Sequence, residues 1–394
     1  MPMKPVALRT FAVAIGLAMM AACGGGGDGT GDVGTGTLRV ALTDASCATE
    51  FSQVNITVSR VRVHRSASIG ESAAGWSDLE IAPPRRINLL DLMNGALEEL
   101  GEIRLRALEY AQIRLVLERD SLGPLTNSVV PNGGGEKPLD TPSAVQSGIK
   151  LNHTFTVEGS EITDLVLDFD ACRSLVSRSD GTYGLKPVVR ALPRALNGIV
   201  GTVDLALSGV VVSAQKNGVV VRQTAPNSVG DFVLAPIDPA QSPYDVVVTA
   251  TDHATAVVAG VPVASDTTTQ ISTTATPISL PPSGTPATRA VSGTVTPAEA
   301  SPTVRALQTL SGVTVEIAFD NADDLTGVHS LTLPIDAPVL ATYANPLPLT
   351  FAPVTGSSGR YTIEAAATGY ATDSDNVDLS SANATKNFVL SVAP

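Results

Sequence analysis

The chain has 394 residues, of which 16% are charged and 4% aromatic, and its formal net charge is −13. This length is sufficient for two or three domains, each with its own core. The acidic balance excludes a nucleic-acid-binding protein, because such proteins need clustered Lys and Arg. With 34 Gly, 27 Pro and few charges, the composition is typical of short strands joined by tight turns.

Residues 1–22 predict a secretory signal peptide. Lys4 and Arg9 form a basic start, and residues 11–22 (FAVAIGLAMMAA) are apolar. This run is shorter than the roughly 20 residues that span a bilayer, but it has the length of a signal core. The site before Cys23 (MAAC) resembles the lipobox of bacterial lipoproteins, with Met20 in place of the usual Leu. The resemblance implies that Cys23 carries a lipid and becomes the mature N-terminus.

Residues 23–36 predict a flexible tether, because GGGGDGTGDVGTG has almost no side chain to pack. Gly24, rather than Asp, follows Cys23. By resemblance to the sorting rules of Gram-negative bacteria, this favours the outer membrane, with the protein facing the periplasm or the outside. We therefore expect a cell-envelope lipoprotein that reaches the membrane through its lipid. A cleaved signal followed by a chance Cys is the alternative.

The two remaining cysteines, Cys47 and Cys172, predict a disulfide in an oxidising compartment. Two separately buried thiols are the alternative. A metal site is not expected, because no CxxC occurs and none of the four His pairs with another at metal-ligand spacing. No cofactor is expected either.

Residues 37–192 predict a first β-sandwich domain. Apolar and polar residues alternate in several segments that we expect to be strands, namely residues 37–44, 51–64, 110–117, 162–169 and 183–189. The Arg side chains of 110–117 are expected to point outwards. We expect a buried aromatic at Trp76, a short helical turn at residues 98–101 and a long loop at residues 127–147.

Several motifs of this segment occur in a characteristic order, namely LTD at 42–44, Trp76, LLDL at 89–92, NG at 94–95, YAQIRL at 110–115, QSGIKL at 146–151, DFD at 168–170 and LKP at 185–187. Together they resemble the bacterial lipoprotein family known as domain of unknown function 4382. The resemblance implies an all-β, transthyretin-like or immunoglobulin-like domain on an exported lipoprotein, and it implies no activity.

Two further sandwiches are expected at residues 197–281 and 288–394. Each contains an opening strand, a Gly-x-aromatic element and a late strand with alternating apolar residues, as in GDF at 230–232 and YDVVVTA at 244–250. This spacing is similar to carboxypeptidase-regulatory-like, or prealbumin-like, sandwiches. The predicted fold class is therefore all-β, with three tandem sandwiches after the signal and the tether.

Chemistry-bearing patterns are few. Asp168 and Asp170 lie on one face of a predicted strand, where paired carboxylates could serve acid–base catalysis or bind a ligand together with Asp44 or Lys150. We favour instead a strand end whose carboxylates are neutralised by Lys or Arg. Ser147 and Lys150 form an S-x-x-K pattern, but Gly148 predicts a loop entering a strand rather than the helix that acyl-enzyme chemistry needs. No catalytic residue is assigned.

Two acidic segments, residues 320–324 and 373–376, have the charge of calcium loops but not their residue order. We expect Asx-capped turns at both places.

The leading hypothesis is a non-enzymatic exported lipoprotein that serves as a binding or structural module of the cell envelope. Its partner would be an envelope protein or a polysaccharide. One alternative is a carbohydrate-binding lipoprotein, which predicts an exposed row of aromatic side chains. Another is a secreted hydrolase with its site near Asp168 and Asp170, which predicts a pocket there with strongly shifted pKa values.

Overall fold

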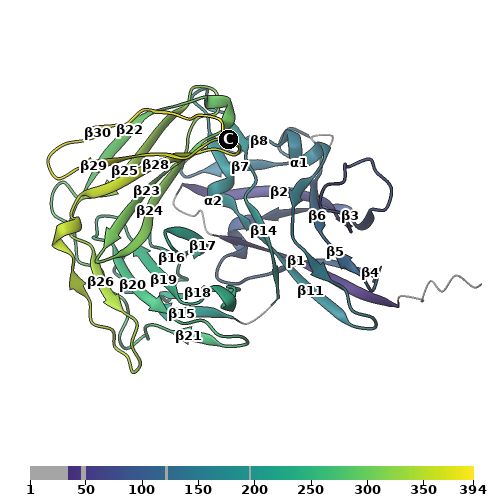
Figure 1. The fold of residues 1–394 in the computed structure, drawn as a ribbon, viewed down its shortest axis with the longest axis horizontal. Helices are drawn as coiled ribbons and strands as arrows, with labels where there is room; N and C mark the ends of the chain where they lie inside the picture. Colours follow the sequence, from purple (N-terminus) through teal and green to yellow (C-terminus); the bar gives the residue numbers. More distant parts are fainter. Residues whose placement is uncertain (1–33, 46–49, 120–122, 195–196) are drawn as a thin grey trace, which may run out of the picture. The chain divides into compact units, whose positions relative to one another are not determined.

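Nearly all regular structure is β-strand, which confirms the all-β prediction (Figure 1). The computed structural model describes residues 34–45, 50–119, 123–194 and 197–394. Cys23, Cys47, the signal and most of the tether lie outside these residues, so lipidation and the disulfide stay predictions. Within the described residues, no helix is long and apolar enough to cross a bilayer.

A first hydrophobic core lies between two sheets. The smaller sheet has the order β14-β11-β1-β4. Its two central strands, β1 (Thr35–Ala45) and β11 (Ile162–Asp170), are parallel; β4 (Glu98–Arg106) pairs with β1, and β14 (Val189–Pro193) pairs with β11. The buried face predicted for β1 is confirmed, because Leu38, Val40 and Leu42 are fully buried, but the alternation stops at the bulge between Val40 and Ala41, and residues 40–44 are all buried.

The larger sheet has eight strands in the order β12-β13-β8-β7-β2-β6-β9, with β3 also paired to β2. Their bounds are β2 Phe51–His64, β3 Ser77–Asn88, β6 Gln112–Leu117, β7 Ser128–Pro131, β8 Lys137–Asp140, β9 Ile149–Leu151, β12 Leu175–Ser177 and β13 Tyr183–Leu185. The remaining elements are β5 (Glu109–Tyr110), β10 (Phe155–Thr156), the 3-10 helix η1 (Leu89–Leu92), and the short helices α1 (Pro142–Gln146) and α2 (Ala171–Ser174).

Two local predictions for this region are wrong. Residues 98–101 are not helical but open β4, because their backbone groups pair with β1 through a bulge near Val40. Residues 127–147 are not one long loop but contain β7, β8 and α1. In both places pairing with a distant strand, which the local sequence does not reveal, decides the conformation.

A second core lies between the sheets β18-β15-β21 and β17-β16-β19-β20-β26-β27. Their bounds are β15 Gly198–Thr202, β16 Val211–Lys216, β17 Val219–Thr224, β18 Asp231–Leu234, β19 Tyr244–Thr249, β20 Ala256–Val261, β21 Thr268–Gln270, β26 Val339–Thr342 and β27 Ala352–Pro353, with the 3-10 helix η3 at Pro239–Gln241.

A third core lies between the sheets β24-β23-β28-β29 and β25-β22-β30, with β31 also paired to β22. Their bounds are β22 Thr288–Thr296, β23 Thr303–Leu310, β24 Val313–Asn321, β25 Val328–Pro334, β28 Arg360–Ala366, β29 Asp373–Asp378, β30 Ala384–Thr385 and β31 Phe388–Val389, with the 3-10 helices η4 (Ala298–Ala300) and η5 (Thr355–Ser357). The turn expected at residues 373–376 is wrong, since these residues form most of the edge strand β29, paired with β28.

One segment crosses the predicted domain boundaries. The strand β26 lies in the sequence between β25 and β28 of the third core, yet it pairs in parallel with β20, and Val339 is buried in the second core. Residues 34–394 accordingly group as one unit. The boundaries at 197–281 and 288–394 remain a prediction from sequence.

Candidate functional site

The carboxylate pair predicted on β11 is found with both side chains on one face. Asp168 is 4% exposed and forms an ion pair with Arg222 of β17, which is 2% exposed. Arg222 also donates from Nη2 to Thr43 Oγ1 of β1, at 3.1 Å. The neutralised strand end that we favoured is therefore confirmed, and the cation comes from a strand that the sequence did not single out.

Asp170 caps the N-terminus of α2. Its Oδ1 accepts a hydrogen bond from the backbone N–H of Arg173 at 3.0 Å, and its Oδ2 lies 3.5 Å from Arg173 Nε. This is the N-cap arrangement that Asp favours, because it satisfies a helix N–H that has no partner within the helix. Burial raises the pKa of Asp170 to about 6, against the lowering effect of Arg173.

Asp44 is fully buried beside these groups. Its Oδ1 accepts a hydrogen bond from the backbone N–H of Ala171 at 2.9 Å, and its Oδ2 has no hydrogen-bond partner among the described residues. Burial raises the pKa of Asp44 well above its usual value, and the nearby Asp170 and Asp168 raise it further. Burial thus favours the protonated form of Asp44, while the N–H of Ala171 and the charge of Arg222 oppose this.

We call Thr43, Asp44, Asp168, Asp170, Arg190 and Arg222 the junction cluster. Arg190 lies opposite Asp168 in the sheet and donates to the carbonyl oxygens of Val221 and Val220, at 2.6 and 2.9 Å. The hollow beside these side chains measures only about 10 Å³, which is room for one water molecule. The cluster joins strands and does not form a substrate pocket.

Lys150, the fourth candidate, lies elsewhere. It is exposed on β9 and faces Arg114 across the strand pair. The loop-to-strand reading of the S-x-x-K pattern is confirmed, since Ser147 lies between α1 and β9. As expected, Arg114 lies on the face of β6 opposite the core residues Ile113 and Leu115, but it is covered there. It is 6% exposed, and its guanidinium donates to the carbonyl oxygens of Ser147 and Ile69.

Trp76 does not pack in the core as expected. It is half-buried on the outer face of the large sheet, where the guanidinium groups of Arg62 and Arg114 lie 4.8 and 5.0 Å from its ring centre. Its Nε1 donates to the carbonyl oxygen of Gly70 at 3.1 Å. Two cations thus occupy the surroundings of the indole that a sugar ring would use.

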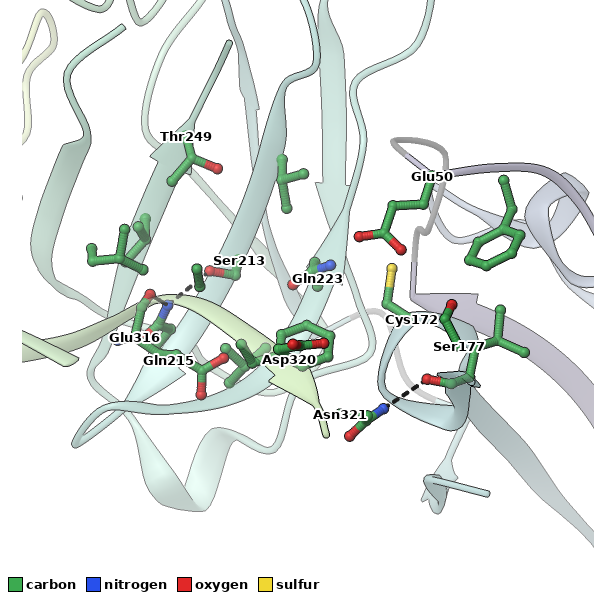
Figure 2. Close-up of a pocket in the computed structure, with 18 residues that line it drawn as sticks. Glu50, Cys172, Ser177, Ser213, Gln215, Gln223, Thr249, Glu316, Asp320 and Asn321 are labelled. Atoms are coloured by element: carbon green, nitrogen blue, oxygen red, sulfur yellow. Dashed lines mark hydrogen bonds between the residues drawn. The ribbon is translucent and has the colours of Figure 1, made fainter. Parts of the chain in front are cut away.

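The cavity drawn in Figure 2 measures about 240 Å³. Figure 2 shows Glu50, Cys172 and Ser177 to the right and Ser213 and Thr249 to the left. One wall consists of Glu50, Phe51, Cys172, Leu175 and Ser177, which come from the part of the chain that forms the first core. The opposite wall comes from β16, β17, β19 and β24. Its lining mixes apolar side chains with carboxylates and amides, so the cavity suits water and small polar solutes.

Three carboxylates that line the cavity, Glu50, Asp320 and Glu316, have raised pKa values. Burial raises the pKa of Asp320 to about 6, the backbone N–H of Ser330 partly offsets this, and Glu50 raises it further. Glu50 is itself exposed in part, and burial raises its pKa as well. The sequence singled out residues 320–324 for their charge, but it did not indicate that Glu50 lies near them.

Glu316 joins all three cores. Its side chain forms ion pairs with Arg173 of α2 and Arg305 of β23, and its backbone N–H and C=O bond to the side-chain amide of Gln215 on β16, at 2.7 and 2.8 Å. Burial raises the pKa of Glu316, and the two Arg groups oppose that rise. Sequence reasoning missed this residue, because a single Glu in an alternating strand gives no signal.

The turn after β24 is an Asx turn, as expected, and it also contacts the first sheets. Asp323 accepts hydrogen bonds from the backbone N–H of Leu325, Thr326 and Ser179. Although burial opposes it, these bonds lower the pKa of Asp323 to about 2. The next residue, Asp324, forms a two-bond ion pair with Arg178, at 2.8 and 3.0 Å.

The described residues contain no group of three or more His, Cys, Asp or Glu that could hold a metal ion. In the junction cluster, Asp168 and Asp170 form ion pairs with Arg222 and Arg173, and Asp44 accepts a hydrogen bond from the backbone N–H of Ala171.

Residues 35–187 match the family described as Domain of unknown function (DUF4382). The resemblance drawn from the sequence is thereby confirmed for this segment, and the family carries no assigned activity. The similarity of residues 197–394 to carboxypeptidase-regulatory-like sandwiches has no such support and stays a prediction. No curated protein matches the chain.

Solved structures resemble the chain only weakly. The TIE protein of Bacillus anthracis matches over 92% of this chain and 51% of its own, at 9% identity and a TM-score of 0.17. The chain thus spans about half the length of that protein. BcpA, the major pilin subunit of Bacillus cereus, matches over 91% of this chain and 100% of its own, at 9% identity and a TM-score of 0.16. The major pilin RrgB of Streptococcus pneumoniae matches over 86% and 68%, at 8% identity and a TM-score of 0.15. At such TM-scores these likenesses carry no functional argument.

Proposed function

We propose that this chain is a non-enzymatic lipoprotein of the Gram-negative cell envelope. A lipid on Cys23 would hold it to the outer membrane, and the glycine-rich tether would separate the lipid from the folded part. The described residues would then serve as a structural or binding module, with an envelope protein or a polysaccharide as partner.

The observation that carries the non-enzymatic part is the state of the junction cluster. Asp168 is paired with a buried Arg222, Asp170 caps α2, and the adjacent hollow has only about 10 Å³. A hydrolase needs a carboxylate that can reach a substrate and exchange a proton with it. These carboxylates instead bind neighbouring strands and a helix end, which is a structural role.

The secreted hydrolase remains the main competing function, because the pKa values of Asp44 and Asp170 are raised, as an acid catalyst would require. The carbohydrate-binding alternative would use Trp76, the sole Trp of the chain. Arg62 and Arg114 lie against that ring, so a sugar would have to displace a guanidinium group to stack there.

Cell fractionation tests the envelope part of the proposal. The full chain is expressed in a Gram-negative host with a labelled fatty acid, beside the Cys23→Ser variant. We expect label and outer-membrane location for the wild type, and neither for Cys23→Ser. A wild-type protein recovered unlabelled in the soluble fraction would refute the anchor.

Activity assays test the non-enzymatic part. The purified Cys23→Ser protein is incubated with chromogenic esters, glycosides and peptides, beside the Asp170→Asn variant. Turnover by the first protein that is abolished in the second would establish the hydrolase instead.

A further inference from the structure

The chain can be divided at residues 195–196 into an N-terminal part (residues 34–194) and a C-terminal part (residues 197–394). The contacts between these two parts are polar and have a definite order of burial. The Asp168–Arg222 pair is most buried, with side chains 5% and 1% exposed. Around it, Arg173–Glu316 is 15% and 3% exposed, and Arg178–Asp324 is 17% and 21% exposed.

The sign of the charges changes from the innermost pair to the outer pairs. In the innermost pair the acid belongs to the N-terminal part and the base to the C-terminal part. In the two outer pairs the bases Arg173 and Arg178 belong to the N-terminal part and the acids to the C-terminal part. Lys186 adds a further cation on the same side and donates to Thr303 Oγ1 at 2.9 Å and to the carbonyl oxygen of Ser301.

Hydrogen bonds between uncharged groups also hold the N-terminal and C-terminal parts in this alignment. Asn94 adopts a left-handed conformation with φ of 56°. Its backbone N–H donates to Thr224 Oγ1 at 3.1 Å, and its Oδ1 accepts from the Thr224 hydroxyl and from the backbone N–H of Val233. Asn321 donates to the carbonyl oxygens of Arg173 and Leu175, at 2.8 and 2.9 Å.

We infer that the motif-bearing face of the N-terminal part is a docking surface whose ligand is the C-terminal part of the same chain. A stable protein–protein interface carries about ten hydrogen bonds, and the bonds across this face reach that number. The alternation of charge makes the docking selective, because a rotated or shifted partner would bring like charges together.

This inference assigns a role to several residues of the family motifs. Thr43, Asn94, Asp168 and Lys186 belong to four separate motifs, and each bonds to the C-terminal part. The matched segment therefore recognises a β-sheet body through these residues. The inference does not depend on the lipid anchor, so it can fail or hold separately from the proposed function.

Cleavage of the chain at the division tests the inference. A site-specific protease site is placed between Arg194 and Asn197 in the Cys23→Ser protein. The remaining cysteines, Cys47 and Cys172, both precede the cut, so no disulfide can join the two pieces. After cleavage we expect the pieces to co-elute in gel filtration at about 1 µM, because a complementary, hydrogen-bonded interface of this kind holds without a covalent link. Two folded pieces that elute separately, or pieces that unfold on cleavage, would overturn the inference.

Charge reversal tests the order of charges. Asp168→Arg in the cleaved protein is expected to weaken association by at least about 30-fold, because it places two buried cations together. The double variant Asp168→Arg with Arg222→Asp should recover most of the affinity. Circular dichroism reports whether both pieces stay folded, and the fluorescence of Trp76 reports on the N-terminal piece alone. Arg360→Ala is the matched control, since the Arg360–Asp378 pair is exposed and lies within the C-terminal part. If single reversal leaves the affinity unchanged, or if the double variant stays separated while folded, the proposed pairing is refuted.

Discussion

Two regions of this molecule hold carboxylates that differ in burial and in partners: Asp168 of the junction cluster is buried, whereas in the cavity Asp320 is half-buried and Glu50 is exposed. In the junction cluster, Asp168 is enclosed together with the guanidinium of Arg222, and hardly any space remains beside them. In the cavity of Figure 2, Glu50 and Asp320 lie near each other, and burial is the main influence on both groups. An enclosed charge with a partner holds strands together, whereas one without a partner responds by binding a proton. Asp168 therefore depends on its ion pair with Arg222, whereas the charge of Asp320 depends on pH.

The largest expected effect comes from removing the cation of the junction cluster. Arg222→Ala leaves Asp168 buried without a counter-ion, and we expect the free energy of unfolding to fall by about 3–5 kcal/mol. Urea denaturation of the Cys23→Ser protein with and without the substitution measures it. The exposed Arg360→Ala change should cost no more than about 0.5 kcal/mol. Equal losses from both substitutions would show that burial of the pair has no special importance.

Asp44 provides the next test, because it is the fully buried junction carboxyl whose pKa burial raises well above its usual value. Its pKa is raised in the folded state, so the folded protein binds the proton more tightly than the unfolded chain. The stabilisation is complete below the unfolded pKa of about 4 and decreases as the pH rises towards the folded pKa. In Asp44→Asn, the loss of stability as the pH rises above about 4 should be smaller than in the parent protein, because the group with the raised pKa is gone. An unchanged pH profile in denaturation experiments would contradict the assignment.

Asp320 should show the same sign with a smaller effect in the cavity. Its pKa of about 6 places the loss of stability between about pH 4 and pH 6. Asp320→Asn should remove about 1–2 kcal/mol of this pH dependence, allowing for partial exposure. Carboxyl NMR titration provides a direct readout, and Asp323, three residues later, should titrate near pH 2 because three backbone N–H groups bond to it. Similar midpoints for the two residues would refute this account.

Glu50→Gln should have the smallest effect. Glu50 is partly exposed, so we expect a change in unfolding free energy within about 0.5 kcal/mol. The substitution is informative for Asp320, because Glu50 raises the pKa of that residue. The titration midpoint of Asp320 should therefore move down in this variant. A midpoint that stays the same would show that the two carboxylates do not interact.

Sequence reasoning succeeded where the local pattern decides the structure. The alternation in residues 37–44 and 51–64 predicted β1 and β2, because one face of each strand is buried. It failed at residues 98–101 and 127–147, where pairing with distant strands decides the outcome. For the site, the pattern placed Asp168 and Asp170 on one face and predicted their neutralisation. It did not identify Arg222 or Glu316, because a single charged residue on a strand carries no sign of what lies opposite to it.

Because β26 pairs with a strand of the second core, fragments of this molecule cannot separate freely after cleavage between the second and third cores. The strands β25 before it and β28 after it belong to the third core, while β26 is bonded along β20 and β27 along β26. A proteolytic nick between residues 281 and 288 would therefore not free the downstream fragment, which would remain threaded into its neighbour's sheet. Release would require the whole β20–β26 ladder to open at once, so the last two cores should unfold as one cooperative unit.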